Sequence, residues 1–463
     1  MTGIYGVILN SGRGALLAQQ KAIEITGHNI ANVNTPGYSR QRVNLAANDP
    51  LYSGIGLMGG GVRATEIQRI YDRFLGLQIN NENQNLGRWE ARKGALERVE
   101  IIFDESSGYG LNQAMSEFWN AWQDLANNPS GHVERVTLLA KSETMATTFN
   151  NMYSNLEQVQ KDIDTSIRGT VEEINLIAQQ VADLNQKIVE VEVNGQNAND
   201  YRDSRDLLLR ELSSMIDINT FENNDGSVTV SVGSGKPLVE SIFAWSLSTE
   251  TNASGLQDIV WVDSDGNTTD ITNDISGGKL KGWIEARDVA IPDYLDRLDD
   301  LAANIISEVN ALHSNGFGLD GSTGNDVFTG TSASDMAVNQ LIADDVNLIA
   351  AAGSAGGVPG DNSNAIAIAN LQNDLLMGGN TATFDDYFNS IVSDVGSGVQ
   401  NATVNFSHQY SMVEHLDNYR ESISGVSLDE EMVNLVKYQH AYNAAAKLIS
   451  LVDELLNTVI SMV

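Results

Sequence analysis

The stretch closest to a cofactor-binding motif is GIGLMG, residues 54–59, which matches the G-x-G-x-x-G pattern of dinucleotide-binding loops. That pattern needs a preceding strand, a helix that opens on the third glycine, and an acidic residue about 20 positions further on. Asn80 and Asn81 stand at that distance, and the glycines continue to Gly61. We therefore interpret the stretch as a flexible glycine loop and expect no cofactor.

Two other patterns could hold a metal ion, but neither has the spacing of a metal site. DSDGNTTD, residues 263–270, is superficially similar to a calcium loop, yet its glycine falls at the fourth position instead of the sixth and the twelfth residue is Asp274 instead of Glu. The six histidines form no H-x-x-x-H pair, and the absence of cysteine excludes thiolate sites. We expect a β-turn at 263–270 and no metal ligands.

The composition narrows the function further. No G-x-S-x-G motif, phosphate-binding loop or paired-carboxylate signature stands out, so we predict no catalytic residues and no enzyme. The net charge of −34, with 61 acidic and 27 basic residues, argues against nucleic-acid and anionic-membrane partners, which need clustered Lys and Arg. We find no apolar run long enough for a membrane span and no features of a cleaved secretory signal.

Apolar residues recur every seven positions at both ends of the chain, as is typical of helices that pack against a partner helix. The N-terminal row is Leu9, Leu16, Ile23 and Ile30. The C-terminal row is Leu428, Leu435, Tyr442, Ile449 and Leu456, accompanied by Tyr438, Ala445, Val452 and Val459. Two such helices bury too little on their own to offset the entropy of ordering them. We expect the two ends to pair, to be loose in the monomer, and to become ordered when many copies pack together.

Helical and strand-like patterns alternate between these ends. Helical spacing predicts helices at 75–103, 111–126, 132–193 and 298–312. A period of two with turn signals predicts strands at 217–283, and we expect loops and short helices over 316–400. The predicted fold is mainly α with an inserted β-domain: a coiled-coil-like terminal pair (1–70 with 420–463), a long-helix bundle (71–216 with 284–419) and a small β-rich insertion (217–283).

The segment GHNIANVNTPGYSRQRV, residues 27–43 and called the signature segment below, interrupts the N-terminal helical pattern. Its candidate assembly residues are Asn29, Asn32, Asn34, Thr35, Pro36, Gly37 and Tyr38. Pro36 lacks a backbone donor and Gly37 permits an otherwise strained backbone, so the helix should break here. The asparagine side chains can satisfy the freed backbone groups. We expect a defined, non-helical link that is suited to packing between subunits.

NIANVNTPGYSRQ, residues 29–41, resembles the signature of the bacterial flagellar rod, hook and hook-associated proteins. Residues 54–79 resemble the segment that follows it in that family, and residues 424–460, with YQHAYNAAAK, resemble its C-terminal helix. The GYSRQRV and SGVSLDEEM stretches, the LDRLDDLAANIISEVNALHSNG stretch at 295–316 and the helical middle favour the hook-associated members.

The resemblance implies a structural protein of the bacterial flagellum that serves motility. Such proteins leave the cell by flagellar type III export without a cleaved signal and assemble through their terminal helices into a ring between hook and filament. The implied partners are further copies of the chain, the hook protein, a second junction protein, and an export chaperone on the C-terminal helix. Two alternatives stay open: another axial subunit, such as a distal rod or hook protein, and an exported enzyme on an axial scaffold.

The charges at the two ends predict how the terminal helices run. If the helices are antiparallel, Arg40 or Arg42 should lie near the acidic cluster Asp429, Glu430 and Glu431, at the start of the C-terminal helix. Exposed ion pairs contribute only about 0–1 kcal/mol. We therefore expect such pairs to set the register of the helices more than their stability.

Overall fold

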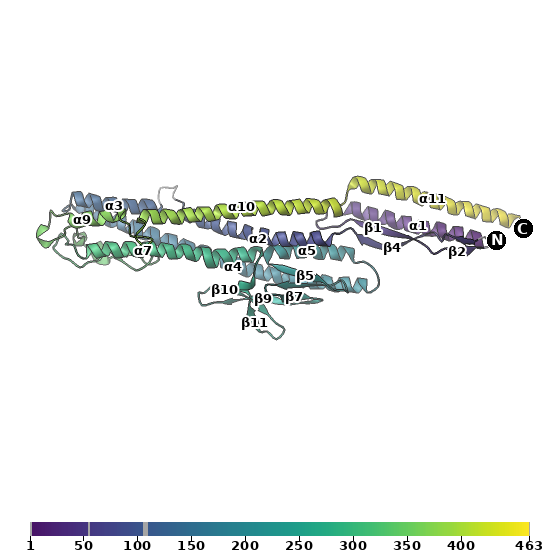
Figure 1. The fold of residues 1–463 in the computed structure, drawn as a ribbon, viewed down its shortest axis with the longest axis horizontal. Helices are drawn as coiled ribbons and strands as arrows, with labels where there is room; N and C mark the ends of the chain where they lie inside the picture. Colours follow the sequence, from purple (N-terminus) through teal and green to yellow (C-terminus); the bar gives the residue numbers. More distant parts are fainter. Residues whose placement is uncertain (1, 54–55, 105–109, 463) are drawn as a thin grey trace.

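The computed structural model describes residues 2–53, 56–104 and 110–462. It is an elongated molecule whose long helices run along one axis, with both chain termini at the same end (Figure 1). The longer helices are α1 (Thr2–Ala31), α2 (Arg73–Ile102), α3 (Leu111–Asn127), α4 (His132–Glu192), α5 (Asn199–Met215), α6 (Gly278–Glu285), α7 (Ile291–His313), α9 (Ser363–Asn370), α10 (Phe384–Ser424) and α11 (Leu428–Ser461). The predicted fold, mainly α with terminal helices and an inserted β-rich region, is confirmed.

Helices α1 and α11 form a two-helix arm at the end that carries the termini (Figure 1). Near the termini, a Cβ built on Gly12 would lie 2.9 Å from Ile449 Cγ1. At the base of the arm, Asn29 Nδ2 donates to Glu431 Oε2 at 3.1 Å. Residues of the two helices therefore meet in opposite order along the chain, and the predicted antiparallel pairing is confirmed.

A strand-rich segment that the sequence analysis did not predict follows α1. Its strands are β1 (Gln41–Ala47), β2 (Leu51–Ser53), β3 (Gly56–Met58) and β4 (Val62–Arg69), with β1 paired to β4 and β2 to β3, both antiparallel. The glycine loop expected at 54–59 is in part strand β3, while Gly54 and Ile55 lie outside the described residues. The signal was weak because β4, VRATEIQR, exposes most of its side chains and alternates poorly.

The core of the helical body is built around aromatic side chains of α3. Trp119 and Trp122 are fully buried. The Trp119 ring stacks on Phe384 at the start of α10, with centroids 5.9 Å apart, and Trp122 meets His313 of α7 edge-on at 6.1 Å. The bulky apolar positions predicted for 111–126 thus join three helices that are far apart in sequence. Helix α4, with 61 residues, runs the length of this body beside them (Figure 1).

The inserted β-rich region forms two small antiparallel sheets on the side of α4 (Figure 1). Their strands are β5 (Ile218–Glu222), β6 (Val228–Val232), β7 (Lys236–Glu240) and β8 (Phe243–Ala244) in one sheet, and β9 (Ser246–Thr251), β10 (Gln257–Val262) and β11 (Thr268–Asp270) in the other. The turn predicted at 263–270 is confirmed, because Asp263 Oδ1 accepts from the backbone N–H groups of Asp265 and Asn267, each at 2.8 Å.

The expectation of loops and short helices over 316–400 is wrong from Phe384 onward, where the 41-residue helix α10 begins. Thr383 caps this helix, since its hydroxyl accepts from Asp386 N at 3.1 Å. Glycines at 396 and 398 hid the helical pattern. An added Cβ at Gly398 would lie 3.5 Å from the Tyr294 hydroxyl oxygen on α7, an ordinary contact distance, so α10 packs on α7 here without requiring a glycine. The stretch before Phe384 contains the short elements β12 (Phe328–Thr329), β13 (Ala337–Val338), α8 (Gln340–Asp344) and α9.

Candidate assembly site at the signature segment

The signature segment begins inside α1, which ends at Ala31, before the residues expected to break it. Thr35 N donates to Asn32 O at 2.9 Å, and Tyr38 N donates to Thr35 O at 3.2 Å, so the chain continues as successive turns. Asn32 Nδ2 donates to His28 O at 3.0 Å, which already accepts from Asn32 N at 3.1 Å. The backbone groups that an asparagine side chain satisfies after the helix are Gln41 N and O, which bind Asn29.

Gly37 occupies a backbone conformation that favours glycine, with φ at +79°. A Cβ added there would also lie 3.3 Å from Leu207 Cβ, so the segment passes close to α5. Asn34, Thr35 and Pro36 are exposed, and within the described structure the Asn34 side chain makes no hydrogen bond. The tip of the segment therefore faces outward while Gly37 contacts the body.

Asn29 is the buried centre of the segment, with 1% of its surface exposed. Its Nδ2 donates to Gln41 O at 2.9 Å, and its Oδ1 accepts from Gln41 N at 3.0 Å. The same Oδ1 accepts from the Tyr38 hydroxyl at 2.8 Å, while Nδ2 also donates to Glu431 Oε2 at 3.1 Å. One side chain thus joins the end of α1 to the start of β1 and to α11.

Arg40 connects the segment to the acidic start of α11. Its Nε donates to Glu431 Oε1 and its Nη1 to Glu430 Oε2, both at 2.7 Å. The predicted proximity of Arg40 to this cluster is confirmed, whereas Arg42 is exposed and makes no ion pair within the described ranges. The expectation that the pair is exposed is wrong for Glu431, whose side chain is only 3% exposed. It is buried because Asn29 and Arg40 cover it from two sides.

On its other side, the segment is held by carboxylates of α5. Ser39 N donates to Asp203 Oδ2 at 2.8 Å, and Gln41 Nε2 donates to Asp200 Oδ1 at 2.6 Å. Arg69, at the end of β4, donates through Nη1 to both Asp203 Oδ1 and Asp206 Oδ2 at 2.7 Å. No motif in the sequence predicts these partners. The segment therefore ties the arm to the helical body within one chain.

The electrostatics of this joint favour a fixed set of hydrogen bonds. Burial, followed by the nearby charges of Asp200, Asp203 and Glu431, raises the pKa of Tyr38 well above its usual range. The hydroxyl therefore stays protonated and can donate to Asn29. Burial likewise raises the pKa of Asp203, and the adjacent Arg69 guanidinium opposes that shift. The geometry suits a rigid connection, since Asn29, Asp203 and Glu431 each bind two or more partners of matching type.

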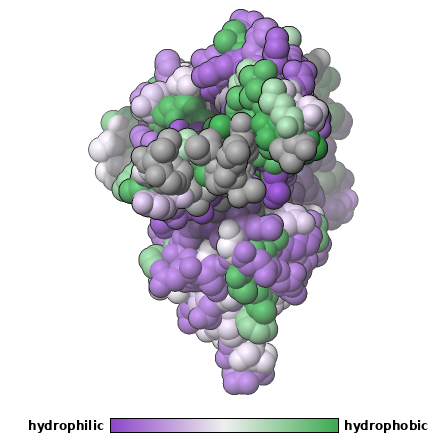
Figure 2. All heavy atoms as spheres, turned by 90° about the vertical axis from the view of Figure 1, so that its right-hand side faces the viewer, coloured by the Kyte–Doolittle hydropathy of each residue, from purple (hydrophilic) through white to green (hydrophobic). Residues whose placement is uncertain are grey.

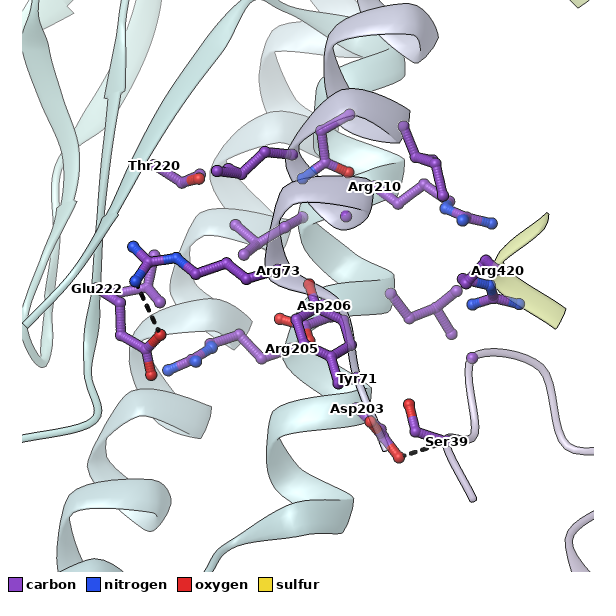
Figure 3. Close-up of a pocket in the computed structure, with 18 of the residues that line it drawn as sticks. Ser39, Tyr71, Arg73, Asp203, Arg205, Asp206, Arg210, Thr220, Glu222 and Arg420 are labelled. Carbon is purple, nitrogen blue, oxygen red and sulfur yellow. Dashed lines mark hydrogen bonds and ion pairs between the residues drawn. The ribbon is translucent and has the colours of Figure 1, made fainter. Parts of the chain in front are cut away.

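A polar crevice of 80 Å³ lies behind the segment, between α2, α5 and β5 (Figure 3). Figure 3 shows Arg73 reaching towards Glu222, at 3.8 Å, and Ser39 bonded to Asp203. Burial, followed by the charge of Asp206, raises the pKa of Tyr71, whose ring lies 4.1 Å from the Arg69 guanidinium carbon. The charged and polar side chains of the crevice pair with one another, as Arg73 does with Glu222, so we assign the crevice to the joint.

The part of the chain that the structure describes contains no group of three or more His, Cys, Asp or Glu side chains arranged to hold a metal ion. Over the same residues, no helix combines the length and the apolar composition that crossing a membrane requires.

The predicted apolar rows lie along the arm but are not its most buried residues. Leu16, Ile23, Ile30, Leu435, Ile449 and Leu456 are half-buried, and Leu9, Leu428 and Tyr442 are exposed. Across the seam Gly12 faces Ile449, and Ala445 and Val452 are the buried apolar residues of α11. The predicted rows therefore flank the seam, where part of their surface remains open to another chain.

Comparisons with known proteins agree with this architecture. Residues 96–328 match a family model described as the flagellar hook-associated protein FlgK helical domain. Residues 9–38 match one described as the flagella basal body rod protein, and residues 420–462 match the flagellar basal body rod FlgEFG protein C-terminal model.

Proteins that are similar to this chain over almost their whole length are described as flagellar hook-associated protein 1. Flagellar hook-associated protein 1 of Bacillus subtilis (strain 168) is 32% identical, with 98% of this chain and 97% of that protein covered. Its counterpart from Escherichia coli (strain K12) is 24% identical over 98% and 99%. The solved structure of the hook junction protein FlgK from Burkholderia pseudomallei shares the fold, with a TM-score of 0.66 and 15% identity over 75% of this chain and all of that one. This chain belongs to the flagellar hook-associated protein 1 (FlgK) family.

Proposed function

We propose that this chain is a structural protein that joins the hook to the filament of the bacterial flagellum, as a ring of identical copies. The arm supports this most directly. It places α1 and α11 side by side at one end, and α11 leaves many large apolar side chains exposed, Leu451 at 53% and Val433 at 68% among them. In the end-on view, hydrophobic patches gather in the upper part, where the arm lies (Figure 2). Apolar surface of this kind favours packing against further chains.

The signature segment would give this assembly a defined geometry. Asn29, Arg40 and Ser39 hold α1, α11 and α5 at one point, so the arm cannot turn freely about the body. The exposed tip at Asn34, Thr35 and Pro36 remains available for contacts with neighbouring copies. A ring needs each copy to present the same angle to the next, and a rigid joint meets that need.

The roles of the remaining parts follow from this assignment. Residues 1–70 with 420–463 would be the assembling unit, 71–216 with 284–419 the supporting bundle, and 217–283 a decoration. The partners would be further copies, the hook protein, a second junction protein and, before export, a chaperone that covers α11. The protein would leave the cell by flagellar type III export and function extracellularly, with no catalytic activity and no cofactor. The alternatives of a rod or hook subunit and of an exported enzyme are not favoured, because the family match at 96–328 is to the hook-associated helical domain.

Replacement in a flagellated bacterium tests this function. A strain that lacks its own hook-associated protein 1 should form hooks without filaments, and this chain should restore attached filaments and swimming. A chain that ends at residue 427, and so lacks α11, should not restore them. Bare hooks in the presence of the exported, full-length chain would contradict the proposal.

A further inference from the structure

A groove lies on the arm between α1 and the strand β4. Its cavity volume is 690 Å³. Its lining includes Arg13, Leu17 and Lys21 on α1 and Arg63 on β4. Leu17 is 56% exposed and provides an apolar floor. Gly14 allows the backbone of β4 to approach α1 closely, since a Cβ added at this position would lie 2.6 Å from Val62 O.

The groove is positively charged in a chain whose net charge is −34. Arg13 and Arg63 make no ion pair with any described residue, and Lys21 pairs only with Glu24 of its own helix, at 3.2 Å. Asp49 is the acidic residue among those that line the groove. An apolar floor between unpaired cations suits a helix that carries leucines beside a carboxylate.

The exposed face of α11 near the C-terminus has this composition. Leu448, Leu451 and Leu455 are 42%, 53% and 46% exposed, and their spacing places them on one face of the helix. Glu454 follows Leu451 by three positions and is therefore its neighbour on the helix surface. It is exposed and makes no ion pair with a described residue. No Lys or Arg follows Lys447.

The groove is not filled by the α11 helix of its own chain. Gly12 faces Ile449 across the seam, whereas the groove is formed by Asn10, Arg13, Gly14, Leu17 and Lys21, which share a different face of α1. Because the helices are antiparallel with Gly12 opposite Ile449, Leu451 of the same chain is level with Asn10, at the edge of the groove nearest the termini. A neighbouring copy that is displaced along the arm by about 10 Å, as happens when the arms are inclined to the ring axis, brings Leu451 level with Leu17 and Glu454 level with Gly14.

We propose that the groove of one copy receives residues 448–455 of α11 from the neighbouring copy. Leu451 and Leu455 cover Leu17, and Glu454 faces Arg13 and Arg63. The two surfaces differ and lie on different sides of the arm, so the contact is head-to-tail and repeats around a closed ring. This inference rests on the proposed function and specifies how adjacent copies meet.

Charge reversal on each side of the contact tests the pairing in the replacement strain described above. R63E and E454R should each lower the fraction of hooks that carry a filament by about tenfold, because each places like charges together. The chain with both changes should recover most of the loss, to within about threefold of the parent, because the pair at 63 and 454 is restored while Arg13 still faces a positive charge. R42E and D453R are matched controls, since both positions are exposed and lie outside the groove and the stripe, and they should have little effect.

A second readout reports the contact directly. The chain contains no cysteine, so L17C and L451C introduce single thiols. Cells that express both variants together should yield a disulfide-linked dimer on oxidation, whereas either variant alone should yield none. Circular dichroism and the thermal midpoint of each purified variant establish that it folds.

The outcomes separate this inference from the function on which it rests. If the full-length parent restores filaments but the double reversal does not recover and no mixed disulfide forms, the groove pairing is wrong and the junction function stands. If R63E is harmful while E454R is not, the groove holds another protein, which also overturns the pairing. If the parent itself fails to restore filaments, the proposed function fails first.

Discussion

Arg40 and Glu431 form an ion pair across 391 positions of the chain, with Nε and Oε1 2.7 Å apart. Asn29 donates to the second oxygen of the same carboxylate at 3.1 Å. The pair therefore connects three elements: the end of α1, the link into β1, and the first turns of α11. A buried carboxylate with two donors is expensive to leave unpaired, so the pair fixes where the arm closes.

Replacing Arg40 with glutamine should loosen the base of the arm. Glu431 would keep only Asn29 as a donor while remaining buried, at a cost of about 2 kcal/mol, or roughly 30-fold faster local opening. Hydrogen exchange of the amides in β1 and the first turn of α11 measures this rate. R42Q is the matched control, because Arg42 is exposed and has no ion pair in the described part of the chain.

A double-mutant cycle isolates the interaction between the two residues. The double variant R40Q/E431Q should lose less unfolding free energy than the two single variants lose in sum. The reason is that no unpaired charge is left buried when both residues are changed. A coupling free energy near zero would mean that the pair does not hold the arm.

Replacing Gly37 with alanine should destabilise the joint by about 1–2 kcal/mol. Alanine is strained at a φ of +79°, and its Cβ would press against Leu207 of α5. Urea unfolding monitored by circular dichroism measures the loss. G27A is the control, because Gly27 lies inside α1 with nothing within 4 Å of an added Cβ. That change should be neutral or stabilising, as alanine favours a helix.

The sequence predicted the long helices well because their apolar positions repeat strongly. The helix predicted at 132–193 is α4, His132–Glu192, and the one predicted at 75–103 is α2, Arg73–Ile102. Helix α10 escaped notice because glycines interrupt its pattern, and its close contact with α7 is a tertiary effect with no local signal. Strand β4 escaped because most of its side chains are exposed, and strand β1 because its partly buried residues do not alternate regularly with exposed ones.

The site was predictable only in part, for a related reason. Arg40 could be matched to the start of α11 because basic residues outnumber acidic ones over residues 1–48, whereas acidic residues cluster at the start of α11. Asp203 accepts hydrogen bonds from Ser39 N and from the Arg69 guanidinium. It is one of 61 acidic residues, and no motif around it in the sequence predicts this role. Partners that are distant in sequence are found only once the helices are placed in space.

Hydrogen exchange on the isolated monomer should reveal a difference between the arm and the body. We expect protection over 75–215 and 290–315 and fast exchange over 1–35 and 425–463, except at the joint where Asn29 and Arg40 bind Glu431. The body buries large aromatic side chains such as Trp119, whereas α11 leaves much of its apolar surface in water, with Leu451 53% exposed. Strong protection at both ends of a confirmed monomer would contradict assembly-coupled ordering of the arm.

Stability should fall below pH 6.5 in a way that depends on His313. This side chain is fully buried, with Nδ1 2.6 Å from Asn325 O and Nε2 accepting from Ala350 N at 2.8 Å. Burial lowers its pKa to about 4, so the folded protein keeps it neutral while the unfolded chain takes up a proton below about pH 6.5. Its contribution is therefore complete above that pH and is lost as the pH falls towards 4.

Urea unfolding at pH 7 and pH 5 measures this contribution. Between those values His313 should account for about 2 kcal/mol of lost unfolding free energy. Asp203, Asp217 and Asp385 also titrate with raised pKa values and change stability in the opposite sense, so the comparison is with H313Q. That variant should be less stable at pH 7 and lose about 2 kcal/mol less than the parent between the two pH values. H415Q, at an exposed position, should follow the parent. Equal losses in the parent and in H313Q would mean that His313 takes up its proton at the same pH in the folded and the unfolded chain.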